Sequence, residues 1–142
     1  MMMTAPGGAI KDIRMCTYRR ERLISAQRLP EGVLSKKDIV SINREFHAGK
    51  VVNDSSLDFA LDLTQKSRNW LKTAAVLTRA ILIDHAFEDG NKRTAAAVIL
   101  ALADMNGVCC NPDRVNAAIV RMLLRNITDI RAIERLIKNA IE

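Results

Sequence analysis

Aromatic residues make up only 4% of this 142-residue chain, and glycine and proline number only six and three. A core must therefore be built from aliphatic side chains, which pack readily between helices, and the scarcity of turn-forming residues disfavours a fold of many short strands. Because 49% of the residues are hydrophobic, one domain of ordinary size can form without metals or disulfides. We therefore expect an all-α domain.

The chain has only three cysteines, and it lacks a long apolar run. An odd cysteine count, with Cys109 and Cys110 adjacent, is typical of reduced thiols in the cytosol. The longest wholly apolar run, residues 95–103, is far shorter than the roughly 20 residues that span a bilayer. The first residues also lack the apolar core of a signal peptide. We expect a cytoplasmic protein with no membrane segment.

Acidic residues are the minority, since 16 Asp and Glu stand against 22 Lys and Arg, and the formal net charge is +6. Such an excess suits an anionic partner, whether nucleic acid, a phosphorylated ligand or an acidic protein. A well-solvated basic surface would explain it equally well. The few aromatics and the lack of a recognisable nucleic-acid motif make nucleic acid an unlikely partner.

Helix signals start at Ser35, which forms an acidic variant of the capping box with Asp38 ahead of apolar residues at helical spacing. Further helices are expected after a cap at Ser55, over residues 70–84, over residues 93–106, from Asn111-Pro112, and after a cap at Thr128. The basic residues 14–29 could form another helix. We expect an N-terminal extension over residues 1–34 and a domain of about six helices over residues 35–142.

The stretch HAFEDGNKRT, residues 85–94, places polar groups between two apolar helices. The N-terminus of the second helix should present unpaired N–H groups and the positive end of its dipole, which bind phosphate. Gly90 permits a backbone conformation or a close approach that a Cβ would obstruct. Lys92 and Arg93 add positive charge at the same place. The stretch therefore predicts a phosphate site.

Two further side chains of this stretch fit transfer from a nucleoside triphosphate. Asp89 beside a phosphate site makes sense if a hard cation such as Mg²⁺ bridges carboxylate and phosphate oxygens. His85 suits a general base that takes a proton from a nucleophile, because histidine is the side chain type most often used for this role. Spacing alone also allows a helix-capping role for His85 and an ordinary turn at Asp89-Gly90. The whole set favours phosphoryl or nucleotidyl transfer.

The same residues resemble the signature of Fic/Doc proteins, His-x-Phe-x-Asp/Glu-Gly-Asn-x-Arg, and the resemblance extends more loosely from residue 35 to the C-terminus. It implies an all-helical domain with a target-docking flap, which could include a β-hairpin, between the first two core helices. The residues at the place of this flap are Gly49, Lys50, Val51, Val52 and Asn53.

The resemblance also implies a role for each motif residue. His85 would be the general base on the target hydroxyl, and Asp89 would orient that hydroxyl or hold Mg²⁺. Phe87 would anchor the loop in the core. The triphosphate of ATP would be bound by Gly90, Asn91, Lys92 and Arg93.

Two positions place the chain nearer to the Doc branch. Fic enzymes that transfer AMP usually carry Gly-Asn-Gly-Arg-x-x-Arg, whereas Lys92 replaces the second glycine here and Ala96 the second arginine, as in Doc. Doc is a toxin that phosphorylates a threonine of elongation factor Tu. The resemblance thus implies a protein kinase acting on a Ser/Thr hydroxyl, with a separate antitoxin as partner.

Two alternatives stay open. Gly90 is the Fic residue, where Doc has alanine, so AMP transfer to a protein hydroxyl is the second reading. A noncatalytic basic module that binds nucleic acid or protein is a third, from another class. Residues 17–22, TYRRER, carry the threonine and glutamate spacing of an inhibitory helix found in relatives, but they end in arginine, and we attribute the match to chance. The oligomeric state stays open as well.

Overall fold

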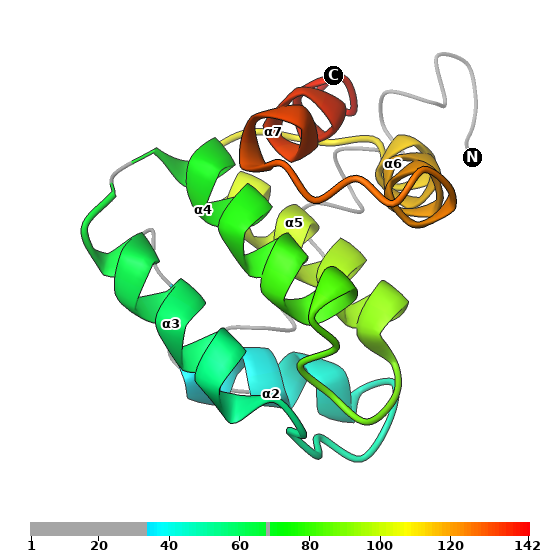
Figure 1. Cartoon of the computed structure of the whole chain (residues 1–142). Helices are drawn as coiled ribbons and strands as arrows, with labels where there is room; N and C mark the ends of the chain where they lie inside the picture. The colour runs from blue at the N-terminus through cyan, green and yellow to red at the C-terminus, as the bar shows by residue number, and fades with distance from the viewer. Residues whose placement is uncertain (1–33, 68) are drawn as a thin grey trace, which may run out of the picture.

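The computed structural model describes residues 34–67 and 69–142, which form six α-helices (Figure 1). These are α2 (Lys36–Arg44), α3 (Asp54–Gln65), α4 (Trp70–Thr78), α5 (Asn91–Met105), α6 (Pro112–Leu124) and α7 (Ile130–Lys138), and a π-helical turn, η1 (Arg79–Ile83), continues α4. Within these ranges the extended pairing is limited to two isolated bridges, Val51 with Phe87 and Cys110 with Ile141. The prediction of an all-α domain is confirmed. The helix expected over residues 14–29 and the match at residues 17–22 lie outside the described residues.

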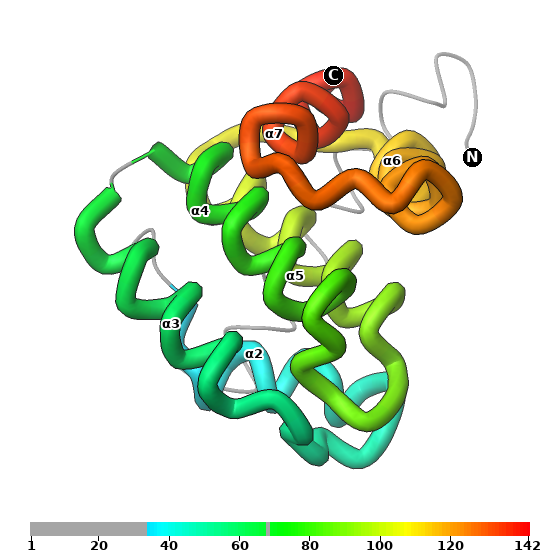
Figure 2. The backbone as a smooth tube through the Cα atoms, in the orientation of Figure 1, coloured from blue at the N-terminus to red at the C-terminus, as the bar shows by residue number. Residues whose placement is uncertain are grey.

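Helices α4 and α5 lie side by side at the centre of the fold (Figures 1 and 2). Helices α3 and α7 pack on α4, while α2 and α6 pack on α5. Every residue of α5 from Thr94 to Ala103 is buried. A helix surrounded in this way must be apolar on all sides, which explains why the apolar runs of the sequence coincide with α5 and with the end of α4. The loop between these two helices is consequently anchored in the core at both ends.

Two of the predicted caps are confirmed. Ser35 Oγ accepts from Asp38 N at 3.1 Å, and Asp38 Oδ2 accepts from Ser35 N at 2.9 Å, which completes the capping box of α2. Asn111 caps α6, with Pro112 in the first turn. In both cases a short polar side chain stands directly before the first residue with helical dihedral angles.

The caps predicted at Ser55 and Thr128 are wrong, each because a neighbouring residue takes the position. Asn53 caps α3 and accepts from Ser56 N at 3.3 Å. Asp129 caps α7 and accepts from Ala132 N at 3.0 Å. Several adjacent residues can cap a helix, and the one whose backbone is not yet helical does so. Likewise α5 begins at Asn91 rather than at Arg93.

The helix expected over residues 70–84 changes its winding before it ends. It is α-helical to Thr78 and π-helical over Arg79–Ile83. Asp84 N donates to Arg79 O at 3.1 Å, and Ala86 N donates to Ile81 O at 3.3 Å, so both bonds span five residues. Short π-helical turns are frequently found at functional sites. The π-helical turn η1 is followed directly by Asp84 and His85.

The C-terminus closes against the loop before α6. Asn111 N donates to Ala140 O at 2.9 Å, and Glu142 N donates to Cys109 O at 3.0 Å. Cys109 and Cys110 are both free thiols, and burial raises the pKa of Cys110 to about 11.

Among the residues that the structure describes, we find no helix with the length and apolar character of a membrane span.

Candidate active site

A cavity of about 630 Å³ opens beside the loop that joins η1 to α5. Its lining combines residues from the end of α2, from the loop and first turn of α5, and from α6: Phe46, His47, Leu82, His85, Glu88, Asp89, Gly90, Asn91, Lys92, Arg93 and Leu123. The volume is within the range of small-molecule sites. All six motif residues predicted for catalysis or phosphate binding, His85 and residues 89–93, therefore line one cavity.

His85 holds its imidazole at this cavity with a left-handed backbone. Its φ is +53°, a conformation that costs a non-glycine residue about 1–3 kcal/mol. The residues on either side are fixed by the flap, since Asn53 Nδ2 donates to Asp84 O at 2.8 Å and Val52 N donates to Ala86 O at 2.8 Å. The imidazole is exposed at the cavity and is not packed in the hydrophobic interior.

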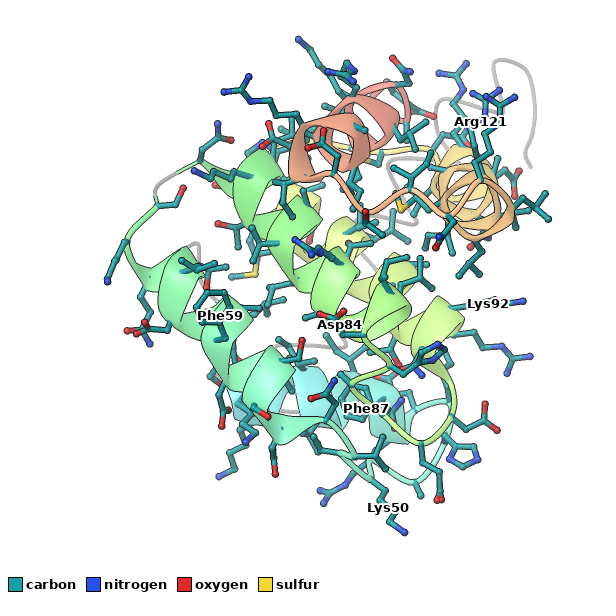
Figure 3. All side chains as sticks on the ribbon, in the orientation of Figure 1. Lys50, Phe59, Asp84, Phe87, Lys92 and Arg121 are labelled. Carbon is teal, nitrogen blue, oxygen red and sulfur yellow. The ribbon has the colours of Figure 1, made fainter. Side chains whose placement is uncertain are left out.

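The first turn of α5 presents open N–H groups to the same cavity. Gly90 is the N-cap, with φ +78°, and no side chain caps this helix. The N–H groups of Asn91, Lys92 and Arg93 form no hydrogen bond among the described residues. Open amides, the helix dipole and two cationic side chains are the components of an anion site. Figure 3 shows Lys92 extending outward from this turn.

Gly90 is required for the close packing of the loop on α2. A Cβ at this position would lie 3.1 Å from Asn43 Nδ2 and 3.3 Å from His47 Cβ, in addition to the strain of a positive φ. The sequence predicted a close approach at Gly90, and the approaching element is α2.

Asn43 is the residue that sequence reasoning missed. Its side chain is fully buried, and its Nδ2 donates to Asp89 O at 3.0 Å and to Thr94 Oγ1 at 2.9 Å. Its Oδ1 accepts from Gly49 N at 2.8 Å. One amide therefore ties α2 to the motif loop, to α5 and to the flap. The available signal was a polar residue on the apolar face of α2, where a buried side chain needs partners.

Asn91 closes the loop on Phe87. Its Oδ1 accepts from Phe87 N at 3.0 Å, and its Nδ2 donates to Phe87 O at 2.9 Å, much as a neighbouring strand would. The Phe87 side chain is 1% exposed and belongs to the core. The Asn91 amide thus fixes the conformation of the loop. The expected phosphate contact of this side chain stays a prediction.

The flap, residues 49–53, pairs with the motif loop and not with itself, so the hairpin that the resemblance allowed is not formed among the described residues. Val52 N donates to Ala86 O, and Glu88 N donates to Lys50 O at 3.0 Å. This pattern makes Val51 and Phe87 a pair whose own N–H and C=O groups face away from each other. Within the described chain Val51 N–H and C=O form no hydrogen bond, so the outer edge of the flap is open. Lys50 projects from it to solvent (Figure 3).

Asp89 lies at the mouth of the cavity with its side chain 72% exposed. Its Oδ1 accepts from Gly90 N at 2.7 Å, and its Oδ2 lies 3.4 Å from Nε2 of His47. The described residues contain no group of three or more His, Cys, Asp or Glu that could hold a metal ion. One carboxylate beside a phosphate site nevertheless fits Mg²⁺, because this ion takes one or two protein carboxylates and completes its shell with phosphate and water.

The fold and the cavity define a helical protein in which the loop between the two central helices opens on a cavity lined by polar and cationic side chains. A family model described as Fic/DOC family matches residues 22–103, which is more than half of the chain, and the protein therefore belongs to this family. The match begins before the predicted domain boundary at residue 35, and that boundary stays a prediction. Comparison with curated proteins and with solved structures found no match. Members of the family are typically transferases that act on proteins and bind a nucleotide with Mg²⁺.

Proposed function

We propose that the protein transfers the terminal phosphoryl group of ATP to a Ser/Thr hydroxyl of a protein target, as Doc does. The observation that carries this proposal is the shared cavity: the His85 imidazole and the open first turn of α5, with Lys92 and Arg93, line the same space. One cavity therefore holds both a candidate general base for the target hydroxyl and a candidate binding site for the phosphates of ATP.

In the proposed reaction the target oxygen attacks the γ-phosphorus, and the bond from that phosphorus to the β–γ bridging oxygen breaks. His85 takes the hydroxyl proton, and ADP leaves with the bridging oxygen. The first-turn amides of α5, Lys92 and Arg93 hold the phosphates and stabilise their growing charge. Bound Mg²⁺ would neutralise further phosphate charge. Asp89 would hold that ion or orient the hydroxyl.

Lys92 and Ala96 support phosphoryl over AMP transfer. In the AMP-transferring relatives, glycine at the position of Lys92 leaves room for a phosphate that a lysine side chain would occupy. Ala96 is buried, at 8% exposure, and supplies no second guanidinium one turn into α5. We therefore place the γ-phosphate toward the attacking hydroxyl. Gly90, the residue of the AMP-transferring branch, favours the second candidate, protein adenylylation.

The open edge of the flap suits an extended segment of the target. Val51 offers one N–H and one C=O on the side away from Phe87, and strand addition uses such an edge. A target threonine or serine held there would lie beside the flap, which pairs with residues 86–88 directly after His85. By resemblance to Doc, we propose elongation factor Tu as a target and a separate antitoxin as inhibitor.

Incubation with ATP labelled at either the α- or the γ-phosphate tests the proposal directly. Purified elongation factor Tu and a translation extract would serve as acceptors, with His85→Ala as control. We expect γ label on protein and none with the variant. Label from the α-phosphate would instead establish AMP transfer, and no label from either position on any acceptor would contradict both enzymatic readings.

A further inference from the structure

A second concavity, larger than the active-site cavity, runs between α4 and α7 and is bounded by the end of α3. Its volume is about 1100 Å³, and it shares no lining residue with the cavity at His85. Helix α7 lies against the N-terminal part of α4, whereas the His85 loop follows the opposite end of that helix line (Figure 1). We refer to this concavity as the basic groove.

Cations dominate the groove. Five line it, Lys72 from α4, Arg79 from η1, and Arg131, Arg135 and Lys138 from α7, against two acids, Asp129 and Glu134. Among the described residues none of the five forms an ion pair. Asp129 is already engaged as the cap of α7.

Lys36, which lies outside the groove, is an example of a cation with counter-charges. Lys36 reaches two carboxylates, Asp54 at 2.6 Å and Asp58 at 2.9 Å, and hydrogen bonds to them raise its pKa. Clustered cations without counter-charges repel one another and attract an anionic partner. The groove therefore has the electrostatics of a docking surface for acidic groups.

The groove is also partly apolar. Leu71, Val76 and Ile130 line it, and Leu63, which is 42% exposed, forms one edge. No aromatic residue of the described chain lines the groove. Single-stranded nucleic acid is usually bound by stacking on aromatic rings, so this lining favours an acidic peptide with apolar side chains.

The N-terminal residues 1–33 of the chain do not match the groove in charge, since they contain six Lys and Arg against three Asp and Glu. Like charge disfavours this segment as the occupant. We propose that the basic groove binds an acidic, partly apolar segment of a partner protein. This inference does not depend on which group the active site transfers.

The test uses the full chain and a fluorescent synthetic peptide of mixed leucine and glutamate, with its glutamine counterpart and a short uridine RNA as comparison probes. Arg131→Glu with Arg135→Glu reverses two groove charges. Arg114→Glu with Arg121→Glu makes the same charge change on the exposed face of α6, outside the groove. We expect the groove variant to weaken acidic-peptide binding about tenfold or more and the α6 variant to change it little.

Several results would overturn the proposal: no binding of the acidic peptide, equal binding of the glutamine peptide, equal loss in both variants, or tighter binding of RNA that the groove variant abolishes. The last would make the groove a nucleic-acid site. Lys72→Gln with Arg79→Gln provides a second groove variant, on α4 and η1, should the α7 variant not fold. His85→Ala should bind the peptide like the unaltered protein, so failure of the groove proposal and failure of the catalytic one are distinguishable.

Discussion

Asn43 Nδ2 lies 2.9 Å from Thr94 Oγ1, and this bond joins the buried face of α2 to the first turns of α5. Both residues are fully buried. The same amide nitrogen also donates to Asp89 O, so the loop in front of the phosphate site is fixed from α2. The positions of the candidate catalytic groups therefore depend on a residue outside the motif.

Replacing Asn43 by leucine should destabilise the protein and slow the transfer reaction. Leucine has a similar volume, but it leaves Gly49 N, Asp89 O and Thr94 Oγ1 without their partner. Thr94 is fully buried, and a buried unsatisfied group costs about 1–3 kcal/mol. Chemical denaturation would measure the change in the free energy of unfolding. Asn116→Leu on the exposed face of α6 is the matched control and should change it little. Equal effects of the two substitutions would show that Asn43 has no special role.

Alanine at Gly90 and at Gly107 should separate crowding from backbone strain. Both glycines have positive φ, +78° and +73°, so alanine is strained at either by about 1 kcal/mol. Only at Gly90 would the new Cβ meet neighbours, Asn43 Nδ2 at 3.1 Å and His47 Cβ at 3.3 Å; at Gly107 nothing lies within 4 Å. We expect Gly90→Ala to lower the thermal midpoint more than Gly107→Ala and to reduce nucleotide affinity. A smaller loss of stability at Gly90 than at Gly107 would refute the close packing described for the loop.

Proline at two adjacent flap positions should give opposite phenotypes. Val51→Pro removes an N–H that forms no bond within the described residues, so the fold should be retained while transfer to the protein target falls. Val52→Pro removes the bond to Ala86 O at 2.8 Å and should lower the thermal midpoint as well. Transfer kinetics and thermal denaturation of both variants provide the measurement. Unchanged target phosphorylation in Val51→Pro would exclude backbone pairing at this edge.

His85→Gly should abolish transfer without loss of stability. Glycine adopts φ +53° without strain, so the free energy of unfolding should be unchanged or about 1 kcal/mol higher. Loss of a general base typically slows a reaction by about 10²–10⁴. His47→Ala, the other histidine of the cavity, is the control and should retain most of the rate. Comparable rates for His85→Gly and the unaltered protein would contradict the role of His85.

Much of the fold is predictable from local sequence signals. The capping box at Ser35 and the cap at Asn111 each depend on one short polar side chain ahead of an apolar pattern, and both are found. The caps of α3 and α7 are off by one or two residues because neighbouring polar residues have similar capping propensities.

The features missed from the sequence depend on contacts between distant segments. The π-helical turn before His85 does not alter the apolar pattern of the preceding helix, so periodicity cannot reveal it. Asn43 forms hydrogen bonds with residues far along the chain, and the sequence around it contains no signal that identifies these partners. The polar groups of the motif line one cavity, and their proposed roles stay predictions. The hydrogen bonds of the Asn91 amide to Phe87 could not be predicted from the sequence.

Titration of the protein with ATP and Mg²⁺, followed by calorimetry, tests most directly whether the cavity beside His85 seats a triphosphate. We expect Lys92→Ala with Arg93→Ala to weaken ATP binding about tenfold or more, because two positive charges in the first turn of α5 are lost. His85→Ala should bind ATP like the unaltered protein and fail only in transfer. ATP affinity that is the same with and without Lys92 and Arg93 would contradict the assignment of this cavity.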